Sequence, residues 1–550
     1  MSNLESGDCD SLEDPDDDPF FLGDEFPWIE QLGSHIYQGK ERIGSLDAKF
    51  IGRSWIRNSF WDHMNEPSEG TCALALELFD QYGRLRKDFY KHDVRKGSGV
   101  WGPELDDEEI VLFESLQINK DARQKKVGTR VVTEILQACG WRGCYAFVMP
   151  GYLRRECPPH GLNEEEEEAF RNNMEDIAIR FWRSLGFRRV GVSGWFAFTD
   201  DPDHPSKRLD ASQDWDPPNK SRKKEELLPD RITAALQEPA DPESYDINRN
   251  VPAPTILLKD LLPDDPENPI WLLTDKHGNT ALHLAAELSR ADDIKYVLSK
   301  KPSLTNLRND EGFTPLEALH EALEEKRTGS RRASGEKADQ FRGFSESNIA
   351  SVGMLTGVEV SDLDHIDVQR IKYGCICGAC IDGFLSPRMH LTLLRHAKEQ
   401  QLRLQEWCAA STDGSIGFPK TFISTSAEKC LPILVKDHLT TNQLVRKGFV
   451  NMWTCIVECL AENMAPSKEN VMQLWESRLP RLRSGKGKAF LDSGGSVKVV
   501  ANMLFCIARS RDELAGTSSY RKNPYEEEIS KLPCCRNDKE YEFARGVCGY

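Results

Sequence analysis

Long apolar runs are missing from this 550-residue sequence, and their absence limits where the protein can work. One of the longest, Val499 to Ala508, is about half the length that a helix needs to cross a bilayer. The start of the chain also lacks the basic segment and apolar centre of a secretory signal. We therefore expect no membrane segment, and reduced thiols in the cytoplasm or nucleus for the 16 cysteines.

Basic residues are missing from the start of the chain, where no lysine or arginine precedes Lys40. Acidic residues are frequent there and repel one another, so residues 1–31 are expected to form an acidic disordered tail. The whole chain carries a net charge of −18. Nucleic-acid affinity comes largely from cations that displace counterions along phosphates, so this charge argues against a nucleic-acid partner.

The length exceeds what one hydrophobic core usually organises, so the chain is expected to hold several domains. Pro-, Ser- and charge-rich stretches without periodicity indicate the linkers. The predicted order is an acidic tail (1–31), a first folded domain that mixes strands and helices (32–205), a linker (206–248), a repeat segment with capping helices (249–326), a second linker (327–344) and a mostly helical, cysteine-containing region (345–550). The predicted class is a multidomain α+β protein.

A cationic turn follows a predicted strand in the first domain. The strand is "EEIVLFESLQIN" (108–119), and the helix after the turn carries apolar residues at the four-residue spacing of one helical face, in "VGTRVVTEILQAC" (127–139). The free N–H groups and the dipole of a helix start can hold a phosphate. Arg123, Lys125 and Lys126 would add positive charge, and Gly128 would let an anion approach the backbone. The alternative is an exposed turn that these cations only keep soluble.

This order of elements resembles the GNAT acetyltransferases. Arg123 and Gly128 match the first and last positions of that family's acyl-CoA motif, whereas Lys126 replaces its first glycine. "CYAFVMPG" (144–151) resembles the next strand, and "MEDIAIRFWRSLGFRRVG" (174–191) resembles the later helix and strand. The resemblance implies a mixed, splayed sheet flanked by helices. It also implies a site for acetyl-CoA formed by Ile118, Arg123, Lys125, Lys126, Val127, Gly128 and Thr129.

Acyl transfer to an amine needs a base for the ammonium proton and an acid for the departing thiolate. Glu114, on the strand before the turn, is the candidate base, because burial beside a cleft would raise its pKa; the alternative is a half-exposed strand glutamate. The family's acid is commonly a tyrosine, but Trp182 occupies that position, which leaves Tyr145 and Tyr152 as candidates. The rival hypothesis is a non-catalytic scaffold that has lost the chemistry.

Two later segments repeat each other, "GNTALHLAA" from Gly278 and "GFTPLEALH" from Gly312. Their offset resembles the period of ankyrin repeats, which implies a short helical array that binds a protein partner. In that pattern His283 is a structural hydrogen-bonding residue rather than a ligand, and the second segment has Glu317 at the equivalent position.

Three cysteines are grouped by glycines in "YGCICGACIDG" (373–383), namely Cys375, Cys377 and Cys380. Three thiolates and one further ligand suit tetrahedral zinc. The fourth ligand is left open among His390, His396, Cys534, Cys535 and Cys548. Because the spacing is not a standard half-site, buried reduced thiols in a turn are the favoured interpretation and zinc is the alternative.

Overall fold

The computed structural model describes residues 26–56, 60–106, 108–140, 143–151, 162–217, 227–237, 257–334, 341–409, 430–478, 488–514 and 525–550. The chain divides into two compact units, residues 1–218 and residues 219–550. Of the predicted acidic tail, residues 1–25 lie outside the described residues, and residues 29–31 already form the first strand.

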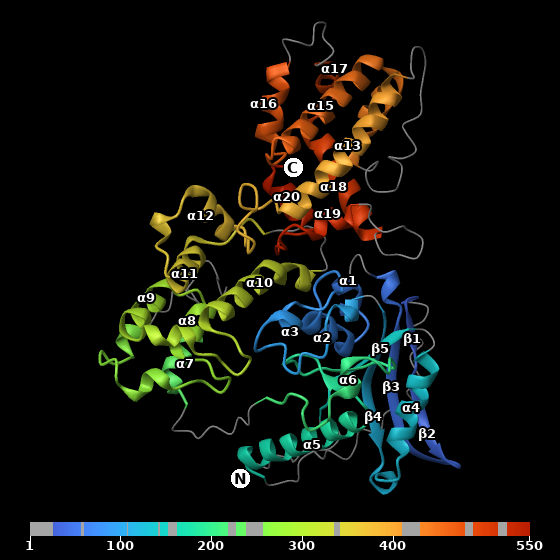
Figure 1. Cartoon of the computed structure of the whole chain (residues 1–550), viewed down its shortest axis with the longest axis vertical. Coiled ribbons are helices and arrows are strands. Elements are labelled where there is room, and N and C mark those ends of the chain that lie inside the picture. The colour runs from blue at the N-terminus through green and yellow to red at the C-terminus, as the bar shows by residue number, and fades with distance from the viewer. Residues whose placement is uncertain are drawn as a thin grey trace, which may run out of the picture. The chain divides into compact units, whose positions relative to one another are not determined.

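A seven-stranded mixed sheet organises unit 1 (Figure 1). The strand order is β1-β3-β4-β5-β7-β6, with β2 paired to β3. Only β4 and β5 pair in parallel among the described strands. The strands are β1 (Ile29–Gln31), β2 (Ser34–Gln38), β3 (Glu41–Ile51), β4 (Glu109–Ile118), β5 (Cys144–Val148), β6 (Arg188–Arg189) and β7 (Phe196–Phe198). This sheet with its helices confirms the predicted α+β class.

Helices cover both faces of this sheet because its strands alternate their apolar side chains between the two faces. Ile110 and Leu112 of β4 belong to a core with the first two helices, whereas Val111 and Phe113 belong to a core with the fourth and fifth. The helices are α1 (Phe60–Asn65), α2 (Glu69–Leu78), α3 (Asp88–Lys91), α4 (Val127–Gly140), α5 (Glu164–Ser184) and α6 (Pro205–Arg208). The predicted strand, turn and helix around residues 108–139 are confirmed as β4 and α4.

Residues 206–217 continue unit 1 beyond the predicted domain end at residue 205. The buried carboxylate of Asp214 accepts hydrogen bonds from Ser98 Oγ at 2.8 Å and from Arg183 Nε at 2.9 Å. Asp216 binds the same guanidinium through Nη1 at 2.7 Å. The N-terminal part of the predicted linker is therefore packed structure; residues 218–226 and 238–248 of that linker lie outside the described residues.

The regular secondary structure of unit 2 is helical in its described residues, which otherwise form loops and two isolated β-bridges (Figure 1). Its helices are α7 (Asp230–Gln237), α8 (Ala281–Glu287), α9 (Ala291–Lys300), α10 (Pro315–Ser334), α11 (Glu346–Thr356), α12 (His365–Lys372), α13 (Pro387–Ala409), α14 (Ile433–Thr441), α15 (Gln443–Ala461), α16 (Lys468–Arg478), α17 (Lys488–Asp492), α18 (Val497–Leu514), α19 (Glu526–Ser530) and α20 (Tyr541–Val547). Two of them cross predicted linkers, since α7 packs into the core of α8 and α9 and α10 extends past residue 326.

The two predicted repeats share one local geometry. Gly278 and Gly312 both have positive φ, 79° and 82°, at the tips of equivalent turns. His283 joins the repeats, because one ring nitrogen lies 2.9 Å from Thr280 Oγ1 and the other 3.0 Å from the carbonyl oxygen of Phe313. The predicted structural role of this histidine is confirmed.

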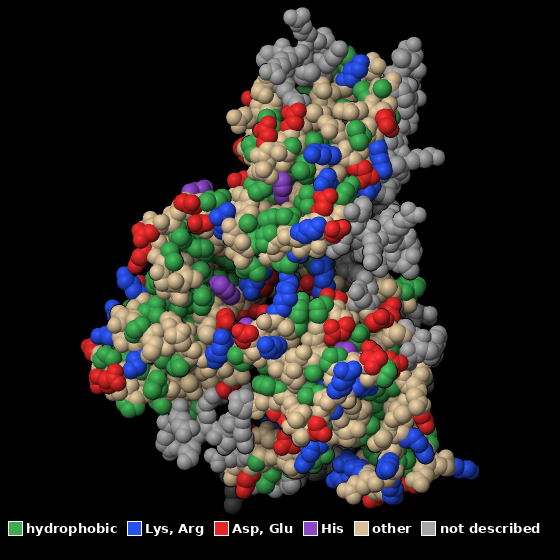
Figure 2. Space-filling view, viewed as in Figure 1, with side chains coloured by type: hydrophobic (Ala, Val, Ile, Leu, Met, Phe, Trp, Pro, Cys, Tyr) green, Lys and Arg blue, Asp and Glu red, His purple; other side chains and the backbone are tan. Residues whose placement is uncertain are grey.

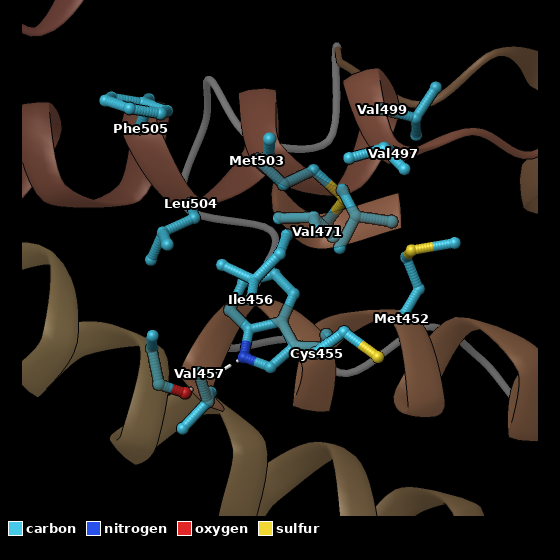
Figure 3. Packing of buried hydrophobic residues seen from close by; sticks show 14 of the residues in the cluster. Met452, Cys455, Ile456, Val457, Val471, Val497, Val499, Met503, Leu504 and Phe505 are labelled. Atoms are coloured by element: carbon cyan, nitrogen blue, oxygen red, sulfur yellow. Dashed lines mark hydrogen bonds between the residues drawn. The ribbon is translucent and has the colours of Figure 1, made fainter. Parts of the chain in front are cut away.

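The largest core of unit 2 lies among α13, α15, α16 and α18. Figure 3 shows Met452 and Ile456 of α15 packed toward Met503 and Leu504 of α18, with Val471 of α16 between them. This core includes the buried cysteines Cys455, Cys459 and Cys548. No described helix is both long and apolar enough to cross a membrane.

Candidate functional site

Four cysteine sulfurs meet in unit 2, and they include all three predicted metal ligands. Cys375, Cys377, Cys380 and Cys535 place their Sγ atoms within 4.8 Å of one another. The Sγ–Sγ distances are 3.6 Å from Cys375 to Cys377, 3.7 Å from Cys377 to Cys380 and 3.5 Å from Cys380 to Cys535. Cys380 and Cys535 are buried, and the other two are half-buried. This cluster could hold a metal ion.

The loop between α12 and α13 brings three of these sulfurs together. Its backbone turns at Gly374, Gly378 and Gly383, whose φ values of 68°, 66° and 80° are ones that side chains rarely adopt. At Gly383 a Cβ would lie 2.4 Å from the backbone carbon of Gln369, so any other residue would displace the end of α12. The glycines that group the cysteines in the sequence are therefore required by the turn.

Two N–H groups point at the sulfurs. The backbone N–H of Ala379 donates to Cys377 Sγ at 3.4 Å, and the side-chain amide of Asn537 donates to Cys380 Sγ at 3.8 Å. Hydrogen bonds of this kind stabilise negative charge on sulfur. Contacts among the thiols also favour one thiolate: hydrogen bonds from Cys380 and Cys535 lower the pKa of Cys375 far below its usual range.

Of the five residues left open as a fourth ligand, the structure places Cys535 beside the three predicted cysteines. Cys534 is half-buried and stands outside the cluster, as does Cys548, which is fully buried in the helical core. His390 has its Nε2 2.8 Å from the carbonyl oxygen of Leu460. Burial lowers the pKa of this histidine. Both predicted histidine candidates lie outside the cluster.

The cationic turn of unit 1 is open to solvent. Arg123, Lys125 and Lys126 are exposed, and Arg123 also donates from Nε to the carbonyl oxygen of Ile118 at 2.8 Å. Gln124 and Lys126 have φ values of 60° and 61°. Left-handed residues in a turn direct successive N–H groups toward one side, where an anion can bind.

Six consecutive amides in this turn are available. Within the described residues, the backbone N–H groups from Gln124 to Thr129 donate no hydrogen bond, and the first amide of this region that does so is Arg130, which donates to Lys126 at 3.1 Å. Val127, Gly128 and Thr129 form the first turn of α4. Every predicted cofactor residue from Arg123 to Thr129 therefore lies at one helix start.

Gly128 has a different use from the predicted one. A Cβ at this position would lie 3.3 Å from the ring of Phe181 and 3.4 Å from Leu116. The missing side chain therefore lets α4 pack closely on α5 and the sheet. The position of the missing Cβ faces these core side chains, so the structure does not support the prediction that Gly128 makes room for an anion.

Strands β4 and β5 part just before this turn. They pair only from Glu109 to Phe113, although β4 continues to Ile118. Beyond Val148, β5 is followed by Met149 and Pro150, and proline lacks the N–H that a strand ladder needs. Among the described strands, the β5 side of β4 therefore has no partner from Glu114 to Ile118.

Glu114 lies where β4 and β5 part, on a β-bulge. Asp47 of β3 pairs with Ser115 and Ala48 pairs with Phe113, so Glu114 between them has no partner residue on β3. Its carboxylate accepts a hydrogen bond from Ser68 Oγ and forms an ion pair with Lys49, whose side chain is 4% exposed. Both oxygens of the predicted base are therefore occupied by donors. Burial raises the pKa of the neighbouring Asp47 carboxyl, and Lys49 opposes this shift.

The candidate acids are dispersed. Trp182 is buried and packs against the rings of Phe113 and Phe187, so it is a core residue. Tyr145 of β5 is half-buried against the core of α1 and α2, with its ring 6.2 Å from Trp101. Tyr152 lies outside the described residues.

Comparisons with protein-family models, curated proteins and solved structures find no match to this chain. The candidate sites therefore stand on geometry alone.

Figure 2 shows acidic and basic side chains interspersed over the face of unit 2 that it draws.

Sequence reasoning missed three side chains of these sites, Lys49, Ser68 and Asn537. Lys49 alternates with Ile51 on one face of β3, which indicates a buried charge that needs a partner but does not identify Glu114 as that partner. Asn537 carries no such signal, because nothing in a loop asparagine indicates a sulfur 157 residues away along the chain.

Proposed function

We propose that unit 2 holds one zinc ion through Cys375, Cys377, Cys380 and Cys535. Zinc–sulfur bonds of about 2.3 Å put the sulfurs of a tetrahedral site about 3.8 Å apart. Three of the six Sγ–Sγ edges, at 3.5 to 3.7 Å, fit that spacing, and all four sulfurs lie within 4.8 Å of one another; this is the observation on which the proposal rests. Four protein ligands leave no open position, so the role is structural rather than catalytic.

The ion would fasten the end of the chain to the loop before α13. Cys535 lies 155 residues beyond Cys380, and bringing two such distant segments together costs considerable chain entropy. Zinc would compensate this cost through its bonds, and Ala379 and Asn537 would stabilise the excess negative charge of four thiolates.

Metal analysis of the full chain, purified without chelator, tests this proposal. We expect one zinc per chain, and loss of the metal in Cys535→Ser. Cys534→Ser is the matched control, since its half-buried thiol is the sequence neighbour but stands outside the cluster, and it should keep its zinc. Metal content near zero in the unaltered protein, or equal loss in both variants, contradicts the proposal. Stoichiometric iron would assign another metal to the same thiols.

A second function, for unit 1, is the binding of acetyl-CoA or a related acyl-CoA. The six available amides from Gln124 to Thr129 support it, because a helix start with free N–H groups suits a diphosphate. The exposed cations beside them add attraction. The side of β4 that no described strand pairs beyond Phe113 supports it as well, since the amide groups of a pantetheine chain could hydrogen bond there as an added strand would.

Thermal unfolding of the full chain with and without acetyl-CoA tests this binding. Ligand at one hundred times its dissociation constant adds about 2.7 kcal/mol to the unit that binds it, which should move that unit's transition by several degrees. Lys126→Glu should abolish the shift. Arg130→Glu, an exposed cation further along α4, should preserve it. An unchanged transition in the unaltered protein would rule out this function.

Acyl transfer to an amine is the activity that such binding would serve, with Glu114 as base. The base would first have to exchange its contacts with Lys49 and Ser68 for the substrate ammonium. Glu114→Gln should bind acetyl-CoA and transfer no acyl group, while Glu109→Gln on the same strand should remain active. Binding without transfer in the unaltered chain favours the non-catalytic scaffold.

For unit 2 we also propose that the repeat segment binds a protein partner. Exposed side chains at the two turn tips, Lys276, His277 and Glu311, are the contacts that a partner would meet. A partner captured by the full chain should be lost when all three are changed to alanine. Retention of the partner would place its site elsewhere.

A further inference from the structure

A second pair of cysteines lies apart from the four-sulfur cluster. Cys430 precedes α14, Cys506 lies within α18, and both pack against the main core of unit 2. Their Sγ atoms are 3.2 Å apart. Both side chains are half-buried rather than sealed in the core.

We propose that Cys430 and Cys506 form an oxidisable dithiol, which a hydroperoxide converts to a reversible disulfide. A disulfide bond is about 2.04 Å long, so the sulfurs need to approach by only about 1.2 Å. Among the described cysteines no third sulfur joins this pair, whereas the four-sulfur cluster has the longer spacing of tetrahedral edges. A pair that no metal-ligand group of the described residues includes suits a direct bond better than a metal.

Charged groups of α20 and α18 favour a thiolate at Cys430. The hydrogen bond from Cys506, together with the field of Arg545, lowers the pKa of Cys430 to about 7, although burial and Glu542 oppose this. The shared hydrogen bond raises the pKa of Cys506 well above its usual range. Glu542 is itself bound by Arg545 at 2.5 Å and by Arg509 at 3.2 Å. The charge of Glu542 is therefore shared between two guanidinium groups, of which Arg545 also lowers the pKa of Cys430.

The asymmetry of the pair assigns the two roles. The Cys430 thiolate attacks one peroxide oxygen, the O–O bond breaks, and Cys430 becomes a sulfenic acid as the other oxygen leaves and is protonated. Cys506 then loses its proton and attacks the Cys430 sulfur, which releases water as the S–S bond forms. Two thiols thus lose two electrons and two protons, and one hydroperoxide is reduced.

Outside the four-sulfur cluster, Cys408, Cys455 and Cys459 of unit 2 lack these features. Cys455 and Cys459 are fully buried in the core, and burial raises the pKa of Cys459 to about 12. Cys408 is half-buried like the pair, but burial raises its pKa and no described thiol contacts it. Cys408 is therefore the matched comparison.

Peptide mapping of the full, metal-loaded chain tests the proposal. The protein is treated with a small molar excess of hydrogen peroxide, alkylated with N-ethylmaleimide, digested without reductant and analysed by mass spectrometry. We expect a linked Cys430–Cys506 peptide as the main oxidised product, lost after dithiothreitol, while Cys408 stays alkylated. If Cys430 and Cys408 are oxidised equally, or if Cys430 proceeds to sulfinic acid without a linked peptide, the dithiol assignment is wrong.

Two variants test the assigned order. In Cys506→Ser, dimedone should label Cys430 as a trapped sulfenic acid. Cys408→Ser should leave the amount of linked peptide unchanged. Labelling of Cys506 rather than Cys430 in the respective single variants would overturn the assigned roles. Zinc measured in the same samples is a separate readout, so failure of the metal proposal would not be mistaken for failure of this one.

Discussion

Arg327 of α10 donates a hydrogen bond from Nη1 to the side-chain oxygen of Asn537 at 2.9 Å, across 210 residues of chain. Asn537 in turn donates to Cys380, one of the four clustered thiols. The guanidinium is fully buried and also lies 3.6 Å from Glu540. One buried cation therefore links the helix of the second repeat to the cysteine cluster.

Arg327→Met should destabilise unit 2 by about 3–5 kcal/mol, because it removes a fully buried guanidinium that binds Asn537 and pairs with the buried carboxylate of Glu540. Urea unfolding followed by the tryptophan fluorescence of the full chain measures this. Lys326→Met on the exposed side of the same helix is the control and should change stability little. If both variants unfold at the same urea concentration, the buried link does not stabilise the unit.

Asp214→Ala should destabilise unit 1 by about 3 kcal/mol or more, because Arg183 would lose a buried ion-pair partner. Asp210→Ala, four residues earlier and exposed, is the control. For the same reason a fragment that ends at residue 205 should unfold at a lower temperature than one that ends at residue 217. Circular dichroism melting of both fragments checks this, and equal melting temperatures would show that the segment contributes nothing.

His283→Ala should cost unit 2 about 1–3 kcal/mol, because Thr280 Oγ1 and the carbonyl oxygen of Phe313 would each lose a hydrogen bond to the ring, although that carbonyl keeps the one from the N–H of Asn309. His277→Ala, an exposed histidine in the preceding turn, should be nearly neutral. Chemical denaturation distinguishes the two variants. A neutral His283→Ala would mean that the repeats stack without this bond.

Glu287 makes the stability of unit 2 depend on pH. Burial, with the negative charges of Asp275 and Glu311, raises its pKa to about 7. The folded state therefore holds a proton that the unfolded state releases above its ordinary pKa of 4.5, so stability falls as pH rises from about 4.5 to 7.

Glu287→Gln should remove this dependence and stabilise unit 2 at pH 8. The gain is at most about 3 kcal/mol, and smaller because the side chain is partly exposed. Melting temperatures at pH 5 and pH 8 measure it, with Glu311→Gln as the control that removes only a neighbouring charge. Identical pH profiles for Glu287→Gln and the unaltered chain would contradict the assignment.

Local patterns predicted the elements well where neighbours in the sequence decide them. The apolar spacing from Val127 to Cys139 predicted α4, and the matching turn signals at Gly278 and Gly312 predicted two equivalent turns. Domain ends were less predictable. The polar composition of residues 206–217 is typical of a linker, yet Asp214 is buried there because Arg183 neutralises it.

The candidate sites divide in the same way. The sequence predicted two groups of site residues, because each group lies within a few consecutive residues. They are the cysteines Cys375, Cys377 and Cys380 and the exposed cations after β4. The partners of Glu114 were not predicted, because Lys49 and Ser68 reach it from separate elements across a β-bulge. Likewise, no local feature distinguishes Cys506 from other helix cysteines.

The sequence by itself determined the order of strand, turn and helix in the first unit, the repeated turns and the triple of cysteines, because short-range spacing and backbone preferences act within a few residues. Only the tertiary structure decided that Cys535 is the fourth thiol, that β4 and β5 part at Glu114, and that Cys430 faces Cys506. Those relations join residues far apart in the chain, and the packing of whole helices and strands sets them.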